Sequence, residues 1–389
     1  MPGLPTDFCR LALAGGALLS LACGHTDPFS APPVGSTQPF DATPPVRLTL
    51  NTSADRGASW LPDGSGILYS AQQLGRGDHD VCLAELPATG GSQRRLICDL
   101  SGHGDDSTNA IESPVLSADG RLAFVRASGR ILGAGADREA VSVAPGPDPR
   151  GATDVQPIPY TVPGEPRHNA VRQLGWQGPA RLVFLGAHVA YRVPCNGCLL
   201  DTIVSGLKVG LLDLAGSGAT VSALPGTDFA SGVTPGPTED EIYFTIGGDS
   251  RVYRRILSSG ATDVVYDFGA AGIARDVHQA AGRLTAAVGG RVAFSVDPEL
   301  GPTQWDSGGI VHVVDLAAGT DVALDGPGLF RRPSLSPDGD RVVAEGYPLI
   351  IEPVIDPVTG LPVLDPVTGD PVTDTTVARV ADLYLFGAP

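Results

Sequence analysis

One hydrophobic pattern recurs along the chain: a short apolar run, a turn that contains Asp-Gly, and a second apolar run. The clearest copies are SWLPDGSGILYS (59–70), SPVLSADGRLAF (113–124) and PSLSPDGDRVVA (333–344). Aspartate caps a turn of this kind, and glycine adopts the positive φ that the turn requires. Each copy therefore predicts a β-hairpin, and the Asp-Gly pair has a structural role rather than a catalytic one.

The hairpin is one part of a larger repeat. With three weaker copies included, the turns fall near residues 64, 120, 178, 240, 282 and 339. Two further strand patterns follow each hairpin, such as DHDVCLAEL (78–86) and QRRLICDL (93–100) after the first. No window has a sustained helical period. Six four-stranded antiparallel units predict an all-β, six-bladed β-propeller, in which neighbouring blades cover the apolar faces of each sheet.

The two ends of the repeat region complement each other. The sixth unit ends with ARVADLYLF (378–386), which is its third strand, so a fourth strand is missing there. VRLTL (46–50) is an extra strand that precedes the first unit. We expect this strand to pair into the last blade and close the ring, so that residues 46–389 form a single propeller domain.

The repeats resemble those of the TolB-like β-propeller family, whose blades read roughly P-x-W-S-P-D-G-x-x-I-A-F and then D-I-Y. Three units match this pattern well, and the other three are degenerate. The resemblance implies a WD40-like propeller that acts as a binding platform in the cell envelope. TolB carries an additional α/β domain before its propeller, whereas this chain has only a proline-rich segment there. A role in the Tol system is therefore not implied.

The N-terminus has the pattern of an export signal. Arg10 precedes LALAGGALLSLA (11–22), an apolar run of 12 residues that is too short to span a bilayer. The following Cys23 resembles the lipidated cysteine of bacterial lipoproteins, although Ser20 stands where an aliphatic residue is usual. An ordinary secretory signal is the alternative. We expect a signal peptide at 1–22, a proline-rich tether at 23–45, and an outer-membrane-anchored protein.

The net charge of −17 narrows the possible partners. Such an acidic chain is repelled by nucleic acid and by anionic lipid headgroups. We therefore expect no nucleic-acid partner and no membrane contact beyond the lipid anchor. The expected partner is an envelope protein, a peptide or a small anion, bound by a monomer without a cofactor.

Four cysteines remain beyond the signal and the lipidation site, an even number that favours two disulfides in an oxidising compartment. Cys82 and Cys98 flank a turn near residue 90, which predicts that they lie opposite each other in a hairpin. Cys195 and Cys198 form CNGC in a predicted loop. A structural bridge is the preferred interpretation of this pair, and redox activity is the alternative.

Arginine recurs at similar depth on the first strands, which line the channel of a propeller. The candidate ligand-binding residues are Arg56, Arg172, Arg275, Arg331, Arg332 and the nearby His278. Guanidinium groups in such a cleft suit a carboxylate or phosphate. The alternative, which we favour, is that they form ion pairs between blades with acidic neighbours such as Asp55, Glu112 and Asp276.

Two other segments carry acidic residues. His103, Asp105 and Asp106, with Asn109, are weak candidates for a cation site, and solvated loop residues are the simpler interpretation. The insertion 348–378 repeats DPVTG and is either a low-complexity surface loop or a flap over one propeller face. In the flap interpretation, Asp356, Asp365, Asp370 and Asp374 would be possible calcium ligands.

No nucleophile elbow, zinc-protease motif or phosphate-binding loop occurs in the sequence. The leading hypothesis is therefore a non-catalytic binding or scaffold lipoprotein that holds its ligand at the channel mouth. The alternatives are a propeller hydrolase or lyase with a central metal, and a purely structural surface protein.

Overall fold

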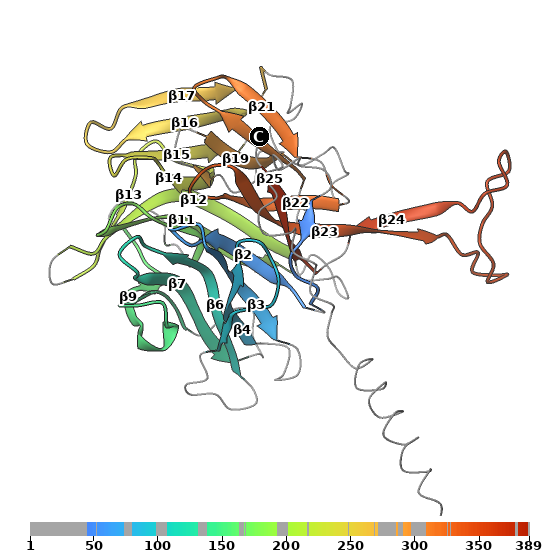
Figure 1. The fold of residues 1–389 in the computed structure, drawn as a ribbon, viewed down its shortest axis with the longest axis horizontal. Helices are drawn as coiled ribbons and strands as arrows, with labels where there is room; N and C mark the ends of the chain where they lie inside the picture. Colours follow the sequence, from blue (N-terminus) through green and yellow to red (C-terminus); the bar gives the residue numbers. More distant parts are fainter. Residues whose placement is uncertain are drawn as a thin grey trace, which may run out of the picture.

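The fold is all-β, apart from one 3-10 turn in the described residues (Pro149–Gly151) (Figure 1). The computed structural model describes residues 45–51, 53–73, 80–98, 107–130, 138–162, 167, 169–192, 201–215, 218–247, 249–267, 269–270, 285–286, 291–296, 309–324, 326, 328–377 and 380–387. Within these ranges no helix is long and apolar enough to cross a membrane.

The strands form sheets of consecutive antiparallel neighbours. One eight-stranded sheet contains β2 (Asp55–Trp60), β3 (Gly66–Gln73), β4 (Asp80–Pro87), β5 (Arg95–Ile97), β6 (Ser107–Leu116), β7 (Leu122–Arg130), β8 (Arg138–Ala144) and β9 (Thr153–Ile158). The next contains β10 (Ala170–Trp176), β11 (Arg181–Arg192), β12 (Asp201–Asp213) and β13 (Thr220–Ala223). A third contains β14 (Ala230–Pro235), β15 (Glu241–Ile246), β16 (Arg251–Ile256) and β17 (Thr262–Asp267).

Two sheets complete the described part of the fold. The first contains β18 (Thr285–Ala286), β19 (Arg291–Val296), β20 (Ile310–Asp315) and β21 (Thr320–Leu324). The second contains β22 (Gly328–Leu335), β23 (Arg341–Pro353), β24 (Thr373–Val377), β25 (Asp382–Gly387) and β1 (Val46–Arg47).

The all-β propeller predicted from the repeats is confirmed, whereas six separate blades are not found. Four blades stand as separate sheets, and β2–β9 form one continuous sheet. The physical reason is that β4 and β6 pair in parallel at Asp80↔Asn109 and Val81↔Ala110, which joins two four-strand units into one ladder. A count of six blades and a closed ring remain predictions.

The Asp-Gly turns have the conformation that the sequence predicts. Gly64, Gly120 and Gly339 have φ of 70°, 87° and 75°. In the first turn the Asp63 carboxylate accepts a hydrogen bond from the Ser65 N–H at 3.0 Å. In the last, the Ser336 hydroxyl accepts one from the Arg341 N–H at 2.9 Å. These local bonds reverse the chain, so each turn fixes the register of its hairpin.

The core consists of apolar clusters between neighbouring sheets. One cluster joins Val125 and Val141 to Phe184, and another joins Leu185 and Val209 to Phe244. Trp60, Ile67 and Tyr69 of the first unit pack against Val343, Leu383 and Leu385 of the last sheet. Each sheet therefore buries its faces against its neighbours, as the apolar strands require.

The segment predicted to close the ring lies against the last sheet. Val46 pairs with Leu385 and Arg47 with Tyr384, and the Leu48 N–H donates to the Leu383 carbonyl at 2.7 Å. The strand covers only Val46–Arg47, less than the predicted 46–50, because Thr49 turns its hydroxyl to the Leu383 N–H and to Asp382.

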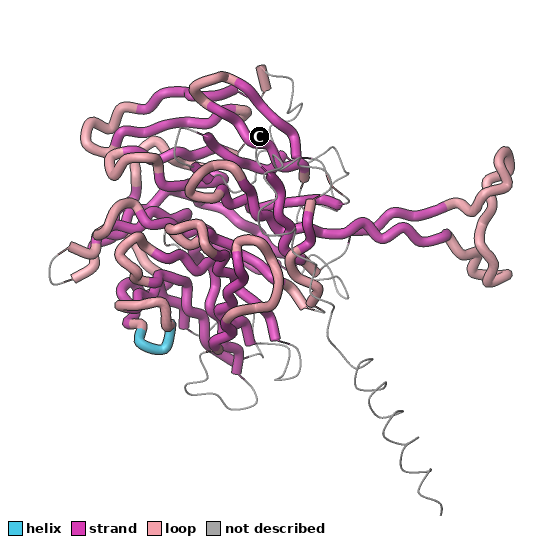
Figure 2. The backbone as a smooth tube through the Cα atoms, in the orientation of Figure 1, coloured by secondary structure: helices cyan, strands magenta, loops and turns pink. Residues whose placement is uncertain are grey.

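The insertion of the last unit forms a β-arm that extends away from the body (Figures 1 and 2). The outer part of β23 pairs there with β24, from Leu349↔Val377 to Pro353↔Thr373. The arm therefore differs from the flap over a propeller face that the sequence analysis considered.

Candidate functional site

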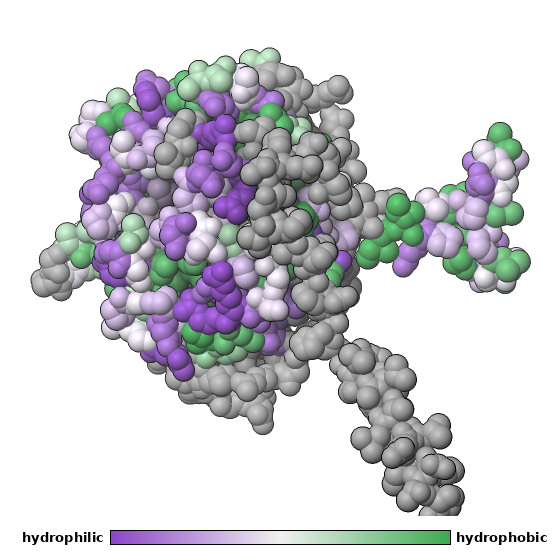
Figure 3. Space-filling view, in the orientation of Figure 1, coloured by the Kyte–Doolittle hydropathy of each residue, from purple (hydrophilic) through white to green (hydrophobic). Residues whose placement is uncertain are grey.

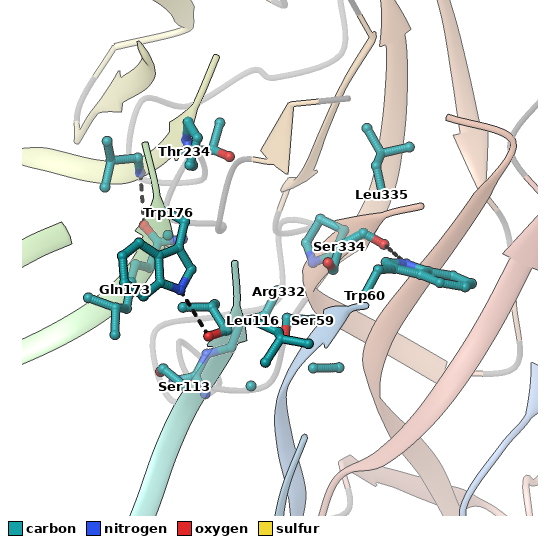
Figure 4. Close-up of a pocket in the computed structure, with 18 of the residues that line it drawn as sticks. Ser59, Trp60, Ser113, Leu116, Gln173, Trp176, Thr234, Arg332, Ser334 and Leu335 are labelled. Carbon is teal, nitrogen blue, oxygen red and sulfur yellow. Dashed lines mark hydrogen bonds between the residues drawn. The ribbon is translucent and has the colours of Figure 1, made fainter. Parts of the chain in front are cut away.

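The first strands surround a central cavity of about 370 Å³ (Figure 4). Side chains of one strand bond to the backbone of the next. The Trp60 indole N–H donates to the Ser334 carbonyl at 2.8 Å, and the Trp176 N–H donates to the Val115 carbonyl at 3.1 Å. The Gln173 side-chain oxygen accepts from the Val233 N–H at 2.8 Å. These bonds hold β22, β2, β6, β10 and β14 around the channel.

Each of these five first strands breaks register at a similar depth. The register shifts occur between Arg56 and Ser59, Glu112 and Val115, Val171 and Gln173, Ala230 and Gly232, and Arg331 and Ser334. Bulges re-aim side chains and are frequent beside active sites.

Three bulge residues share a left-handed conformation. Gly57, Ser113 and Arg332 have φ of 62°, 51° and 51°. For Ser113 and Arg332 this conformation carries steric strain that the surrounding structure must compensate. All three residues line both the large cavity and a second one. The bulges therefore stand where the two parts of the channel meet.

The second cavity is smaller and more polar. Its volume is about 150 Å³, and its charged lining residues are Arg56, Glu112, Arg172 and Arg332. Ser70 and Gln72 contribute further polar side chains. A small molecule with a negative group would meet three guanidinium groups here, and the bidentate geometry of arginine suits a carboxylate or phosphate.

A buried carboxylate beside this cavity orders two of the arginines. Glu345 is fully buried and accepts hydrogen bonds from the Gly57 N–H at 2.8 Å, Arg331 Nε at 3.2 Å and Arg332 Nη1 at 3.1 Å. The Tyr347 hydroxyl donates a fourth at 3.2 Å. Because a buried charge is costly unless it is paired and hydrogen-bonded, this network fixes the position of Arg332.

The Tyr347 hydroxyl is held in its neutral form. Burial, followed by the charge of Glu345, raises its pKa to about 12. The guanidinium of Arg331 lies 4.6 Å from the centre of the Tyr347 ring. Tyr347 therefore serves this network as a hydrogen-bond donor at neutral pH.

A second glutamate, Glu139, lies close to residues of the small cavity. Burial, and then the charge of Glu112, raises the pKa of Glu139 to about 7, against the opposing effect of Arg172. Glu139 begins the buried part of β8, and Glu112 and Arg172 line the small cavity. A carboxyl of this kind exchanges a proton near neutral pH, as a general acid or base requires.

The structure brings three of the predicted arginines, Arg56, Arg172 and Arg332, into the lining of the small cavity, and Arg331 lies against Glu345 and the Tyr347 ring. Arg331 and Arg332 are ion-paired with Glu345, a partner that the sequence analysis did not name. In the sequence, Glu345 could have been found as the single acidic residue within the apolar strand pattern RVVAEGY. Asp55 lies instead in the contact between the N-terminal segment and the last sheet. Arg275, His278 and Asp276 lie outside the described residues.

The described residues do not fit a central cation. They contain no group of three or more His, Cys, Asp or Glu side chains that would hold a metal. The oxygens of Glu345 already accept four hydrogen bonds from protein donors. His103, Asp105 and Asp106 fall outside the described ranges.

One predicted disulfide is confirmed. Cys82 and Cys98 are bonded, with Cα atoms 4.4 Å apart. The pairing of Leu83 with Ile97 in β4 and β5 places them opposite each other, as the hairpin pattern predicts. Cys23, Cys195 and Cys198 lie outside the described residues.

No family profile and no curated protein sequence matches the chain. A gluconolactonase from Xanthomonas campestris aligns at a TM-score of 0.49 and 14% identity, over 88% of this chain and 89% of that one. Regucalcin, a calcium-binding protein from Agrobacterium tumefaciens, aligns at 0.47 and 14%, over 89% and 92%. TolB from Acinetobacter baumannii aligns at 0.46 and 14%, over 87% of this chain but only 64% of the TolB chain. At this identity the likeness concerns the fold alone.

These comparisons correct the order of the functional hypotheses. A non-catalytic binding or scaffold protein was expected first, and this expectation is wrong. The similar folds include those of a gluconolactonase and a luciferin-regenerating enzyme beside that of TolB. The pKa of Glu139 lies near neutrality, and the charges of Glu112 and Arg172, which line the small cavity, contribute to that value.

Proposed function

We propose that the chain is a hydrolase that opens a small ester or lactone carrying a negative group, in the polar end of its channel. The observation that carries this proposal is the convergence of Arg56, Arg172 and Arg332 with Glu112 in one small cavity, beside the titratable Glu139. The guanidinium groups bind the anionic part of the substrate. Glu139 supplies the base, because its pKa leaves a large unprotonated fraction near pH 7.

The reaction follows from these two roles. The Glu139 carboxylate removes a proton from water as the water oxygen adds to the ester carbonyl carbon. The guanidinium of Arg172 stabilises the oxyanion that forms. The tetrahedral species then expels the alkoxide, which takes the proton back from Glu139. A lactone would leave as a hydroxy acid.

The test is a panel of lactones and aryl esters, with and without a carboxylate, assayed with the full chain. We expect the charged substrates to be preferred, and kcat/KM to rise with pH through about 7 as Glu139 deprotonates. Glu139→Gln should lower kcat by roughly 100-fold or more, Arg172→Gln should also lower kcat, and Arg56→Gln should chiefly raise KM for the charged substrates.

Glu239→Gln is the matched control, because Glu239 is an exposed glutamate in the turn before β15. It should leave the rate and its pH profile unchanged. No turnover of any substrate, or a Glu139→Gln variant as active as the wild type, would sink the proposal.

We propose in addition that the blades number six and form a closed ring. The four-strand halves of the β2–β9 sheet are supported as two blades by the apolar cluster of Leu68, Leu83, Ile111 and Phe124 between them. The pairing of β1 with β25 supports closure.

Export and lipid attachment at Cys23 form part of the same proposal. The apolar run 11–22 and the Cys82–Cys98 disulfide support an oxidising compartment. Mass spectrometry of the protein purified from its native envelope tests this. A diacylglyceryl group on Cys23 is expected, and a chain that still begins at Met1 contradicts it.

A further inference from the structure

The β-arm ends in two copies of one nine-residue unit. The extended residues Val354, Val363 and Val372 recur at this interval and bond to one another. The Val354 N–H donates to Val372, the Val363 N–H to Val354 and the Val372 N–H to Val363, each at 2.8 Å. The tip is therefore a closed three-way arrangement of backbone rather than an open loop.

Each unit contains the same Asp-Pro-Val-Thr-Gly turn. The Asp356 carboxylate accepts from the Val358 N–H at 2.7 Å, and the Asp365 carboxylate accepts from the Val367 N–H at 2.7 Å. Gly360 and Gly369 supply φ of 68° and 76°. Because both aspartates and both glycines stabilise their own turns, the arm ends in two equivalent and locally ordered turns, residues 356–360 and 365–369, which we call the prongs.

The prongs present apolar side chains to solvent. Val358 is 91% exposed and Val367 is 90% exposed, and each lies within a turn. Ile351 and Leu361, at 65% each, extend the apolar surface along the arm (Figure 3). A single exposed valine is ordinary, whereas a repeated set on an ordered projection is typical of an interaction site.

The charge of the arm restricts its partner. The acidic residues of the arm, between positions 349 and 377, are Glu352, Asp356, Asp365, Asp370 and Asp374, and no Lys or Arg lies in that range. Backbone N–H groups of Val367 and Thr368 lower the pKa of Asp365, so it is ionised at neutral pH. A second copy of this chain, with a net charge of −17, would be repelled.

We propose that the arm docks onto another protein whose surface carries apolar pockets bordered by Lys or Arg. Val358 and Val367 fill two such pockets, and the surrounding carboxylates pair with the basic border. Because the two prongs belong to one rigid arm, occupation of the first pocket raises the effective concentration of the second prong. This docking is independent of the hydrolase activity in the channel.

The probe for the test is an alternating Lys-Leu peptide, compared with poly-Lys and with an alternating Glu-Leu peptide. Binding to the full chain is followed by fluorescence anisotropy at two salt concentrations. We expect the Lys-Leu peptide to bind most tightly. Val358→Ser combined with Val367→Ser should weaken it at least tenfold, and Asp370→Asn with Asp374→Asn should weaken it and reduce its salt dependence.

Val264→Ser is the matched control, since Val264 is an exposed valine on β17, within the body of the propeller. It should bind as the wild type does, and far-UV circular dichroism should confirm that all variants are folded. Equal binding by the double valine variant, or equal binding of poly-Lys, would overturn the proposal. So would sedimentation of the wild type as a dimer that the double valine variant converts to a monomer, because the occupant would then be a second copy.

Discussion

At the scale of the residue, the surroundings of Asp55 strongly raise the pKa of its carboxyl. It is fully buried, and its Oδ2 accepts from the Asn51 side chain at 2.6 Å, while Oδ1 has no partner among the described residues. Burial is the main cause that raises its pKa to about 7, and the nearby charge of Asp382 adds to it. Asp382 is itself ion-paired with Arg47. The charge of Asp55 also contributes to the raised pKa of the buried Tyr69.

This position predicts that stability falls as the pH rises from the unfolded pKa of 3.8 to the folded pKa of about 7, and changes little above it. A carboxyl whose folded pKa lies above its unfolded value stabilises the fold at low pH, and the contribution is lost as pH rises toward the folded pKa. Between pH 5 and pH 8 we expect Asp55 to cost about 3 kcal/mol of unfolding free energy. In urea unfolding at both values, the loss in Asp55→Asn should be smaller than that of the wild type by this amount, and the contribution of Glu139 should remain.

Asp263→Asn, which removes an exposed carboxylate of β17, should keep the full pH dependence of the wild type. If Asp55→Asn also kept the full pH dependence, the Asp55 carboxyl would not be a titrating group.

At the scale of the element, β5 is a three-residue strand that depends on its neighbour. Among the described strands it pairs with β4 alone, through three residue pairs, and the Cys82–Cys98 bond lies directly beside them. The bond closes a segment with a sequence separation of 16. A closed loop of this size removes conformational entropy from the unfolded chain.

We expect Cys82→Ala combined with Cys98→Ala to lower the unfolding free energy by about 3 kcal/mol in guanidinium titrations. A reducing agent should destabilise the wild type by a similar amount and leave the double variant unchanged. A variant as stable as the wild type would mean that the β4–β5 pairing does not need the bond.

At the scale of the whole molecule, the contact between β1 and β25 decides whether the blades form a ring. Directly opposed residues on antiparallel strands have Cα atoms about 4.5–5.5 Å apart, which suits a disulfide. Val46→Cys with Leu385→Cys should therefore crosslink under oxidising conditions and raise the Tm by roughly 5 °C or more, because it closes most of the chain.

Val46→Cys with Phe386→Cys is the control, because a shift of one residue turns the second side chain to the opposite face. Peptide mapping identifies the crosslink. If the Val46–Leu385 pair did not crosslink, or crosslinked without any gain in Tm, the ring would not be closed by the contact between β1 and β25.

The sequence by itself determined the features that depend on neighbouring residues. The Asp-Gly turns, the alternation of short strands and the Cys82–Cys98 hairpin could all be read from it, because turn chemistry and strand pairing across a short loop are local. The number of separate blades could not be read from neighbouring residues. The parallel contact of β4 with β6 merged two units into one sheet, and no hairpin pattern encodes that pairing.

Only the tertiary structure decided which charges meet. The arginines at similar depth on the first strands could be predicted to gather near the channel, since equivalent strands lie at equivalent radius. Glu345 lies opposite Arg331 within the β22–β23 hairpin, so that pairing is local, whereas its contact with the Gly57 N–H comes from another sheet. The raised pKa of Glu139 could not be predicted, because it depends on burial and on Arg172 of a different sheet. The arm, too, turned away from the body, because its nine-residue units bond to themselves rather than to a propeller face.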